Sequence, residues 1–429
     1  MPSKTTLRMS GSGWLQRGAA ILLSFGLAYC TCLAATHALA QWNFLRDRPE
    51  GLRLAISWDS RNPMYYAAMA RVQERSLQGA DPQELIGLYE KAVQLSPARA
   101  SYWADLGGVY EMAGRQQDAQ RAYERARELF PNSPDINWRV GNFYLRQGKV
   151  EEALPAFQRV LLGNPSLWWT TFDLVWRAGA DDNLIFDRML PPDTNVYIRC
   201  LHYLSEKGRM DAASQAWKRL LALGQAFEPQ AAFPYLDALI REKRVEELAA
   251  AWTAVAERHP QRLALGTGSD RINNGGFESE ILNGGLDWRV WAIEGAIVSV
   301  DTSIHFEGAR SLKVRFEGKS NLDYHHIYQL VPVQPNTIYR FTGYLRVQDI
   351  TTDSGPRFQI QDAYDASRLS LLTESLTGTA MWARRTLDFQ TGPETHLLLI
   401  RVMRKPSGKI DNQIAGAAWI DRMSLAPIE

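Results

Sequence analysis

Hydrophobic and polar positions follow different periods along the chain, and the changes of period divide it into successive regions. Residues 1–45 end in a long apolar run, and residues 46–262 place apolar and small residues at helical spacing. Residues 263–271 are small and polar, and residues 272–429 alternate with a period of two between turn-forming residues. The pattern predicts a multidomain α + β chain: an N-terminal transmembrane helix, a helical array, a linker and an antiparallel β-sandwich.

The apolar run predicts a membrane segment. No formally charged residue occurs between Gly18 and Leu45, and Trp14 and Trp42 flank its most apolar part. A bilayer crossing needs about 20 predominantly apolar residues, so this run is long enough. The sequence Ala38-Leu39-Ala40 also matches the A-x-A site of a cleaved secretory signal, which is the alternative. We favour a retained anchor because that site lies far beyond the end of a short apolar signal region.

The orientation of this segment does not follow from charge alone. Basic residues stand on both sides of it: Lys4, Arg8 and Arg17 before it, and Arg46, Arg48 and Arg53 after it. We expect a single-pass protein of the bacterial inner membrane. Its short tail is expected inside, and its body in the periplasm or exterior, because both later domains are compatible with export.

The helical region contains a sequence repeat. Residues 103–110 read WADLGGVY, which has the spacing W-x2-L-G-x2-Y, and Ala119, Tyr123, Ala126 and Pro131 follow it. The same residue types recur 34 positions later at Gly141, Tyr144, Ala153, Phe157 and Pro165, and 34 positions earlier at Tyr89, Ala92 and Pro97. The pattern weakens between 166 and 192 and then returns. We count about five units from 62 to 262, one of them degenerate.

This repeat resembles the tetratricopeptide repeat family. The resemblance implies pairs of antiparallel helices in which small residues such as Gly107, Ala119 and Ala126 allow close approach. It also implies a concave groove for a peptide or a partner protein, although a rigid spacer is an alternative role. Family members often line this groove with basic residues and asparagines on the first helix of a unit, where this chain has Asn137, Arg139, Asn142 and Arg146.

The C-terminal region predicts a sandwich of about eight to ten short strands. Its alternating runs include AIVSVD (296–301), RSLKVRF (310–316), HHIYQLVPV (325–333), TIYRFTGYLRV (337–347), THLLLIRVM (395–403) and AAWIDRMSL (417–425). The polar segment 351–365 is interpreted as a surface loop.

Several phrases of this region resemble the galactose-binding-like jelly rolls of carbohydrate-binding modules. They are INNGGFES, GLDWRVW, GARSLKVRF, NTIYRFTGYLRV and AWIDRMSL, in that order. In such modules a calcium ion often ties the opening segment to the last strand, remote from the ligand. The resemblance therefore implies a structural calcium at Glu278 and Asp421, although both are also explained as ordinary carboxylates at turns and strand ends.

Sugar recognition needs exposed aromatic rings beside polar groups. Tyr324, Tyr364 and Trp382 are our candidates for glycan binding, in or near predicted loops and strand ends. Trp288, Trp291 and Trp419 lie in phrases that fit the core better.

Composition and motifs restrict the function further. Lys and Arg total 48 against 47 Asp and Glu, a formal charge of +1, so the chain lacks the basic excess of a general nucleic-acid binder. Three cysteines exclude a disulfide-stapled scaffold. The sequence has no G-x-S-x-G, phosphate-loop or H-E-x-x-H motif, and we expect no catalysis and no required cofactor.

Together these features suggest a non-catalytic, membrane-anchored envelope protein. Its repeats would bind a protein partner and its sandwich a polysaccharide, in exopolysaccharide or O-antigen assembly or export. This assignment depends on analogy between domains. The alternative is a pure protein–protein scaffold whose jelly roll binds no sugar.

Overall fold

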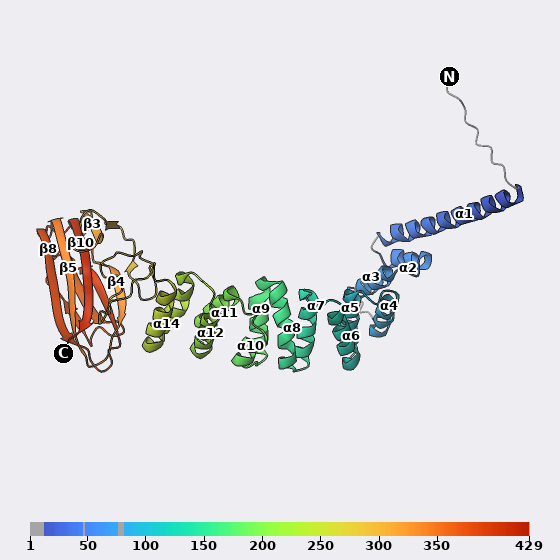
Figure 1. The fold of residues 1–429 in the computed structure, drawn as a ribbon, viewed down its shortest axis with the longest axis horizontal. Coiled ribbons are helices and arrows are strands. Elements are labelled where there is room, and N and C mark those ends of the chain that lie inside the picture. The colour runs from blue at the N-terminus through green and yellow to red at the C-terminus, as the bar shows by residue number, and fades with distance from the viewer. Residues whose placement is uncertain (1–12, 46–47, 76–80, 429) are drawn as a thin grey trace, which may run out of the picture. The chain divides into compact units, whose positions relative to one another are not determined.

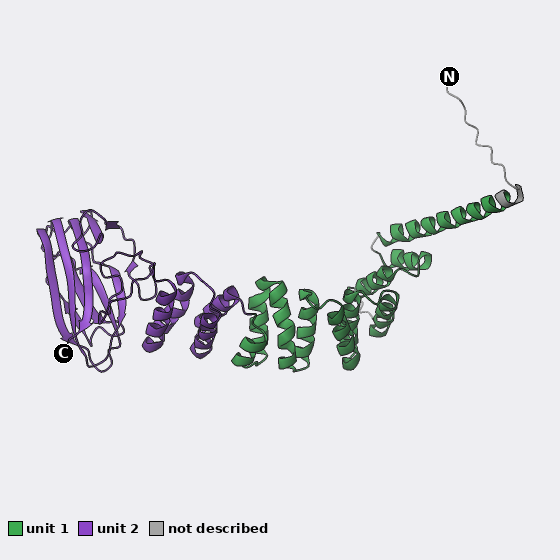
Figure 2. Ribbon diagram, viewed as in Figure 1, with its two compact units in different colours: residues 1–191 green, residues 192–429 purple. Residues whose placement is uncertain are grey.

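The structure, a computed structural model, describes residues 13–45, 48–75 and 81–428. Lys4 and Arg8 of the basic tail and Arg46 lie outside these ranges. Contacts divide the chain into two compact units, residues 1–191 and 192–429 (Figure 2). The division falls at Pro191–Pro192, where the degenerate stretch of the repeat ends.

The first unit begins with the apolar helix α1 (Gly13–Phe44), shown in Figure 1. It is long and apolar enough for a membrane span or a signal segment, and Leu22, Leu23 and Phe25 on it are 72–75% exposed. Its last turns pack against helices α2 (Pro49–Trp58) and α3 (Pro63–Glu74). Ala40 is fully buried there, in a cluster with Ala55 and Tyr65.

Six helix pairs form the array in the described residues, so the sequence count of about five units is one too low. The degenerate stretch folds as a complete pair, and the last two pairs belong to the second unit. After α3, the helices are α4 (Pro82–Leu95), α5 (Ala100–Met112), α6 (Gln116–Leu129), α7 (Pro134–Arg146), α8 (Val150–Gly163), α9 (Trp168–Arg177), α10 (Asp182–Arg188), α11 (Thr194–Glu206), α12 (Met210–Ala222), α13 (Phe233–Arg241) and α14 (Val245–Arg258).

The repeated glycines set the distance between the helices of a pair. A Cβ atom on Gly107 of α5 would lie 3.0 Å from the Tyr123 ring of α6. A Cβ atom on Gly141 of α7 would come within 2.7 Å of the Phe157 ring of α8. Both contacts leave no room for a side chain, which confirms the predicted role of the small residue at this repeat position.

The second unit ends in a sandwich of ten strands in two antiparallel sheets. The sheet orders are β1-β4-β9-β6-β7 and β2-β3-β10-β5-β8. The bounds are β1 (Arg289–Val290), β2 (Ala296–Asp301), β3 (Ser311–Glu317), β4 (Tyr324–Pro332), β5 (Ile338–Ile350), β6 (Arg357–Asp362), β7 (Ser370–Leu372), β8 (Gly378–Gln390), β9 (Leu397–Arg404) and β10 (Ala415–Pro427). Each of the six predicted runs overlaps a strand of this sandwich.

Segment 351–365 is not simply a surface loop, as the sequence suggested. Its middle forms β6, which pairs with β7 and β9. Phe358 and Ile360 of this strand are fully buried in the core, while Gln361 on the opposite face is only half-buried. Three of the polar residues that suggested a loop, Arg357, Gln359 and Gln361, therefore alternate with the core residues of an internal strand, and the other polar residues lie at its end or in the connections beside it.

The last helix pair packs directly on the sandwich within the second unit. Gly284 and Gly285, in the segment before β1, lie against the rings of Phe233 on α13 and Trp252 on α14. Arg289 of β1 forms an ion pair of 2.6 Å with Asp237 of α13. The repeat array and the sandwich are therefore in direct contact as well as connected by a linker.

Candidate functional site

The four predicted groove residues lie on α7, but the structure shows them engaged within the array. Asn137 is fully buried and donates to the carbonyl oxygens of Pro131 and Ser133. Asn142 donates to the Trp138 carbonyl, one turn earlier on the same helix. Side-chain amides used in this way hold the helix rather than remain available to a partner.

The two predicted groove arginines form ion pairs with the preceding repeat. Arg139 lies 2.9 Å from the Asp105 carboxylate, which also binds Arg71 at 2.8 Å. Arg146 forms a two-bond contact with Glu111, 2.6 and 2.8 Å long. Arg71, Asp105 and Arg139 are 34 residues apart, so they form one ladder along the first helices of three successive units. The sequence suggested that the Arg139 charge was free for a partner protein. In the structure it is paired with the Asp105 carboxylate of this ladder.

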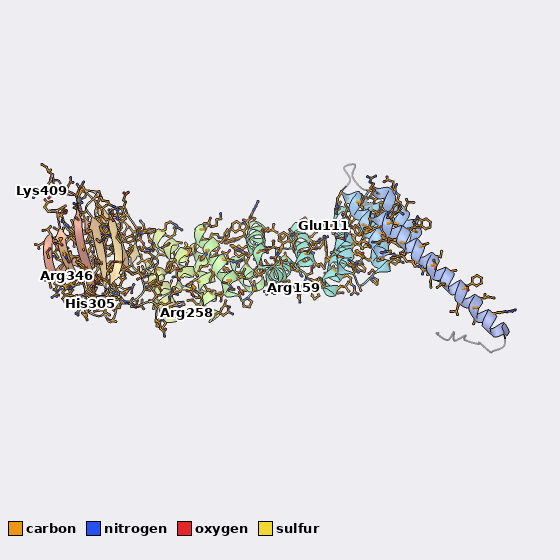
Figure 3. All side chains as sticks on the ribbon, turned by 90° about the horizontal axis from the view of Figure 1, so that it is seen from above. Glu111, Arg159, Arg258, His305, Arg346 and Lys409 are labelled. Atoms are coloured by element: carbon orange, nitrogen blue, oxygen red, sulfur yellow. The ribbon has the colours of Figure 1, made fainter. Side chains whose placement is uncertain are left out.

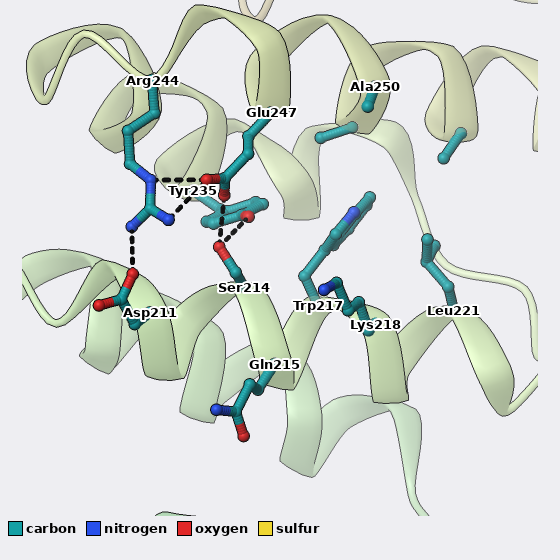
Figure 4. A pocket seen from close by; sticks show the side chains of 12 residues that line it. Asp211, Ser214, Gln215, Trp217, Lys218, Leu221, Tyr235, Arg244, Glu247 and Ala250 are labelled. Carbon is teal, nitrogen blue, oxygen red and sulfur yellow. Dashed lines mark hydrogen bonds and ion pairs between the residues drawn. The ribbon is translucent and has the colours of Figure 1, made fainter.

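A hollow of about 560 Å³ lies among helices α12, α13 and α14 (Figure 4). Trp217, Leu221 and Ala251 contribute apolar surface to it. On its polar side Glu247 accepts hydrogen bonds from Arg244 and Ser214, 2.7 and 2.6 Å long. The hollow can take an apolar side chain of a partner against Trp217, Leu221 and Ala251, because the polar groups Ser214, Arg244 and Glu247 at its other side already bond to one another.

The three predicted sugar-binding aromatics lie in different environments. Tyr324 begins β4 with 1% of its surface exposed, and burial raises the pKa of its hydroxyl. Its ring packs in the core against Phe316, 5.5 Å between centroids. A sugar cannot stack on a ring enclosed in this way, so the structure contradicts the assignment of Tyr324.

Tyr364 follows β6 and faces the last helix pair. Its hydroxyl donates to the Ile240 carbonyl of α13 over 2.9 Å, and the Lys243 ammonium lies 5.3 Å from its ring centroid. Burial, with the Asp362 carboxylate nearby, raises the pKa of this hydroxyl to about 12. In this structure the ring contributes to the contact between helix pair and sandwich.

Trp382 lies in the middle of β8, rather than in a loop, and belongs to an aromatic group on the outer face of its sheet. Phe306, from the connection between β2 and β3, stacks on Tyr344 of β5 at 3.8 Å. Trp382 meets the same phenylalanine edge-on at 5.9 Å. Phe306 is 39% exposed, and the other two rings are half-buried. We call Phe306, Tyr344 and Trp382 the aromatic trio.

The sequence did not identify Phe306 and Tyr344. Tyr344 could have been found from the alternation of its strand, which places it on the same side as Arg340 and Arg346. Phe306 carries no such signal, because its position depends on a loop held from distant parts of the chain. Among the tryptophans expected in the core, Trp288 and Trp419 are buried, whereas Trp291 is 53% exposed.

The predicted metal pair holds that loop. Asp421 of β10 is fully buried, and its Oδ2 accepts the backbone N–H groups of Phe306 and Glu307 over 2.7 and 3.2 Å. Glu278 Oε1 accepts those of Ala309 and Arg310 over 2.9 and 3.1 Å. Burial raises the pKa of Asp421, and the Glu278 charge adds to this effect. The two carboxylates therefore position the segment that carries Phe306.

In this structure the two carboxylates of the predicted calcium pair accept backbone N–H groups. Calcium takes about six to eight oxygen ligands. Asp421 Oδ1 accepts the Arg422 N–H over 2.6 Å, so both oxygens of this carboxylate bond to the backbone. In the described part of the chain, no group of three or more His, Cys, Asp or Glu side chains is arranged to hold a metal ion. His325 and His326 are therefore not joined by a third such ligand. Structural calcium stays a prediction, and its test is the effect of chelation on the melting temperature of the full chain.

Comparisons with known proteins agree with the repeat. Residues 113–166 match a family model described as tetratricopeptide repeat. No curated protein matches the sequence. The structure is similar to Pseudomonas aeruginosa PilF, with 16% identity and a TM-score of 0.28, over 54% of this chain and 93% of that one. It is also similar to YrrB, described as a repeat protein with an unusual peptide-binding site, with 15% identity and a TM-score of 0.26, over 50% and 94% of the two chains.

The C-terminal sandwich is similar to the CBM22-1 xylan-binding domain of Paenibacillus barcinonensis Xyn10C. The identity is 14% and the TM-score 0.24, over 36% of this chain and 92% of that one. Similarity at this level carries no functional argument. The chain thus contains a helical array, of which residues 113–166 match the tetratricopeptide repeat, followed by an antiparallel sandwich of two sheets.

Proposed function

We propose that this chain is a non-catalytic, membrane-anchored envelope protein that binds a protein partner with its repeats and a glycan with its sandwich. The process we assign to it is exopolysaccharide or O-antigen assembly or export, at the bacterial inner membrane. The observation that carries the glycan assignment is the aromatic trio. Two half-buried rings on a sheet and the more exposed ring of Phe306 in the loop beside it offer apolar surface against which the C–H groups of sugars can pack.

The glycan assignment is tested by binding of the full chain, in detergent, to immobilised bacterial polysaccharides. Trp382→Ala and Phe306→Ala are each expected to weaken binding about tenfold, because a lost aromatic contact is worth about 1.4 kcal/mol. Trp291→Ala is the matched control, since it removes an exposed tryptophan of the same domain outside the trio. Equal binding by all four proteins, or no binding to any glycan, would refute the assignment.

One observation favours the alternative scaffold without a sugar ligand. Tyr364 and Arg289 of the sandwich bind Ile240 and Asp237 of the last helix pair, so part of the jelly roll already serves a protein contact. This alternative predicts no glycan binding by the wild-type chain. It also predicts no change on replacing Trp382, so the same experiment distinguishes the two functions.

The burial of Ala40 supports the retained anchor. Cleavage after the Ala38-Leu39-Ala40 signal would remove Ala40 from its cluster with Ala55 and Tyr65. It would also make Gln41 the new N-terminal residue. The side chain of Gln41 lies 3.4 Å from the Tyr65 hydroxyl. The mass of the protein recovered from membranes tests this: the full chain is expected, and a chain beginning at Gln41 would show that α1 is a signal.

The exported body is tested separately. A reporter that functions only after export, fused behind residue 60, is expected to be active. A reporter active only in the cytoplasm would contradict the envelope assignment. The absence of catalysis is tested by incubating the full chain with envelope glycans, where release of reducing sugar or acyl groups would show an enzyme.

We assign the partner to the array, and within it to the hollow among α12, α13 and α14, where Trp217, Leu221 and Ala251 give an apolar lining. Ala250→Trp is expected to fill this hollow and to reduce co-purification of a partner. Thr253→Trp on the same helix is the control, because Thr253 is exposed and does not line the hollow. Equal loss with both variants would remove the hollow as the site.

A further inference from the structure

Two arginines on the same sheet as the aromatic trio, Arg346 and Arg384, form no ion pair with any residue that the structure describes. Arg384 of β8 stands directly opposite Tyr344 of β5, and Arg346 of β5 stands opposite Trp419 of β10. Directly opposed residues of an antiparallel pair point to the same face. Both guanidinium groups therefore belong to the outer face that carries the trio. Figure 3 labels Arg346 on this sandwich.

Other cations of this face are paired. Arg340 binds Asp388 at 2.6 Å, and Lys313 lies 3.5 Å from Asp301. In the described residues Arg384 has no ion pair, and Arg346 has only the Trp419 ring, 5.7 Å from its guanidinium carbon. The positive charge without a carboxylate partner is thus concentrated beside the exposed rings.

A hollow of about 510 Å³ lies along the same face, next to Trp419, which Arg346 and Lys313 cover at 5.7 and 5.0 Å. The cations that line it are paired: Lys313 lies 3.5 Å from Asp301, and Arg315 and Lys319 lie 3.9 and 2.9 Å from Glu317. The face therefore offers room for more than one sugar unit, and the positive charge without an ion pair stays at Arg346 and Arg384.

The contacts with the last helix pair leave this face free. Arg289 is in β1, and Tyr364 follows β6, and both strands belong to the other sheet. We therefore consider which external ligand would fit this face. Such a ligand needs an apolar ring face for the trio and an anionic group within reach of two guanidiniums. Guanidinium groups bind carboxylates through paired N–H donors, so a sugar with a carboxyl group supplies both features in one residue.

We propose that the outer face of sheet β2-β3-β10-β5-β8 binds an acidic polysaccharide containing uronic acid residues. Sugar rings stack on Phe306, Tyr344 and Trp382, and their carboxylates bind Arg346 and Arg384. This inference depends on the proposed glycan function and narrows its ligand. Screening weakens charge-based attraction, so affinity for the acidic chain falls as salt rises.

The test compares each acidic chain with the same chain after removal of its charge. The full protein in detergent is titrated against polygalacturonate and alginate, each also in carboxyl-esterified form. The wild type is expected to prefer the free acids at least about tenfold, the effect of one charge-assisted contact. The double variant Arg346→Gln/Arg384→Gln is expected to lose this preference and to keep weaker binding to the esters.

Arg340→Gln is the matched control, since it removes a paired cation from the same face. It is expected to keep the preference, and melting curves check that every variant folds. Equal affinity for acids and esters would overturn the acidic ligand and leave glycan binding intact. So would equally tight binding of poly-glutamate, which has charge but no sugar. Binding to none of these chains, nor to a neutral glycan panel, would overturn the proposed function itself.

Discussion

Arg404, at the end of β9, is a fully buried cation that forms no ion pair with a carboxylate in the part of the chain that the structure describes. Its guanidinium donates to five oxygens, those of Ser354, Asn321, Leu322, Thr352 and Asn412. These acceptors lie in three connecting segments, so one side chain ties them together. Arg404→Met keeps the length but leaves buried carbonyl oxygens without donors, and we expect it to cost about 3 kcal/mol of unfolding free energy.

Thermal unfolding of the full chain measures this cost, and hydrogen exchange localises it. Arg340→Met is the matched control, because it removes an exposed ion pair with Asp388 worth at most about 1 kcal/mol. Protection should fall in residues 352–354 and 407–412 for Arg404→Met only. A loss no larger than that of the control would show that these segments are held by other contacts.

Asp287 predicts a pH dependence of stability. Burial raises the pKa of this carboxyl to about 6, and its Oδ2 accepts the Leu282 N–H over 2.6 Å. A raised pKa favours the protonated form in the folded state. Its contribution is therefore fully present below the unfolded pKa of about 4 and is lost as the pH rises through 6. The two pKa values differ by about 2 units, which corresponds to about 3 kcal/mol.

Asp287→Asn is expected to remove this dependence, because the amide oxygen still accepts the Leu282 N–H without a charge. The melting temperature of the variant should then exceed that of the wild type above pH 7 and approach it below pH 4. Asp388→Asn is the control, since Arg340 lowers the pKa of Asp388 and gives the opposite sign. The assignment would be contradicted if the melting temperature of Asp287→Asn changed between pH 4 and pH 7 by as much as that of the wild type.

At the scale of elements, the ladder of ion pairs predicts how successive repeats stabilise each other. Asp105 on α5 binds Arg71 of α3 and Arg139 of α7, and its side chain is only 10% exposed. Asp105→Asn weakens both contacts, and we expect a loss of about 1.5 kcal/mol. The measurement is hydrogen exchange in α3, α5 and α7.

Asp135→Asn is the control, since Asp135 contacts the same Arg139 at 3.6 Å but is 78% exposed. An exposed pair is worth about 0.5 kcal/mol or less. Equal effects of the two variants would mean that the ladder does not couple the repeats. Lower protection confined to α5 would have the same meaning.

The elements that the sequence predicted well are those whose signals are local and repeated. The same close contact between a glycine and an aromatic ring occurs in successive helix pairs, at one spacing in the sequence. The examples are Gly107 with Tyr123 and Gly141 with Phe157. Strand β6 was missed because its outward positions are polar, and only its pairing with β9 shows that it is internal. Alternation reports which faces differ in polarity, but not which strand lies beside which.

The site was predicted less well, and Tyr324 shows why. The register of β4 against β9 shifts between Tyr324 and Ile327, at the two histidines. Tyr324 and Ile327 therefore both enter the core although they are three positions apart, which strict alternation forbids. Trp382 was chosen as a candidate on its ring type alone, and its role in sugar binding stays a prediction. Phe306 needed the long-range contact of its loop with Asp421, which no local pattern contains.

At the scale of the whole molecule, the contact between the last helix pair and the sandwich predicts that they unfold together. A methyl group on Gly284 would meet the Phe233 ring, whereas one on Gly392 would be 3.8 Å from its nearest neighbour, Thr395 Oγ1. We therefore expect Gly284→Ala to weaken this contact and Gly392→Ala to leave it intact. Calorimetry of the full chain should show the transition of the second unit separate into two steps in Gly284→Ala alone. One unchanged transition in both variants would mean that Phe233 moves aside at little cost, and that Arg289 with Asp237 suffices to hold the sandwich on the array.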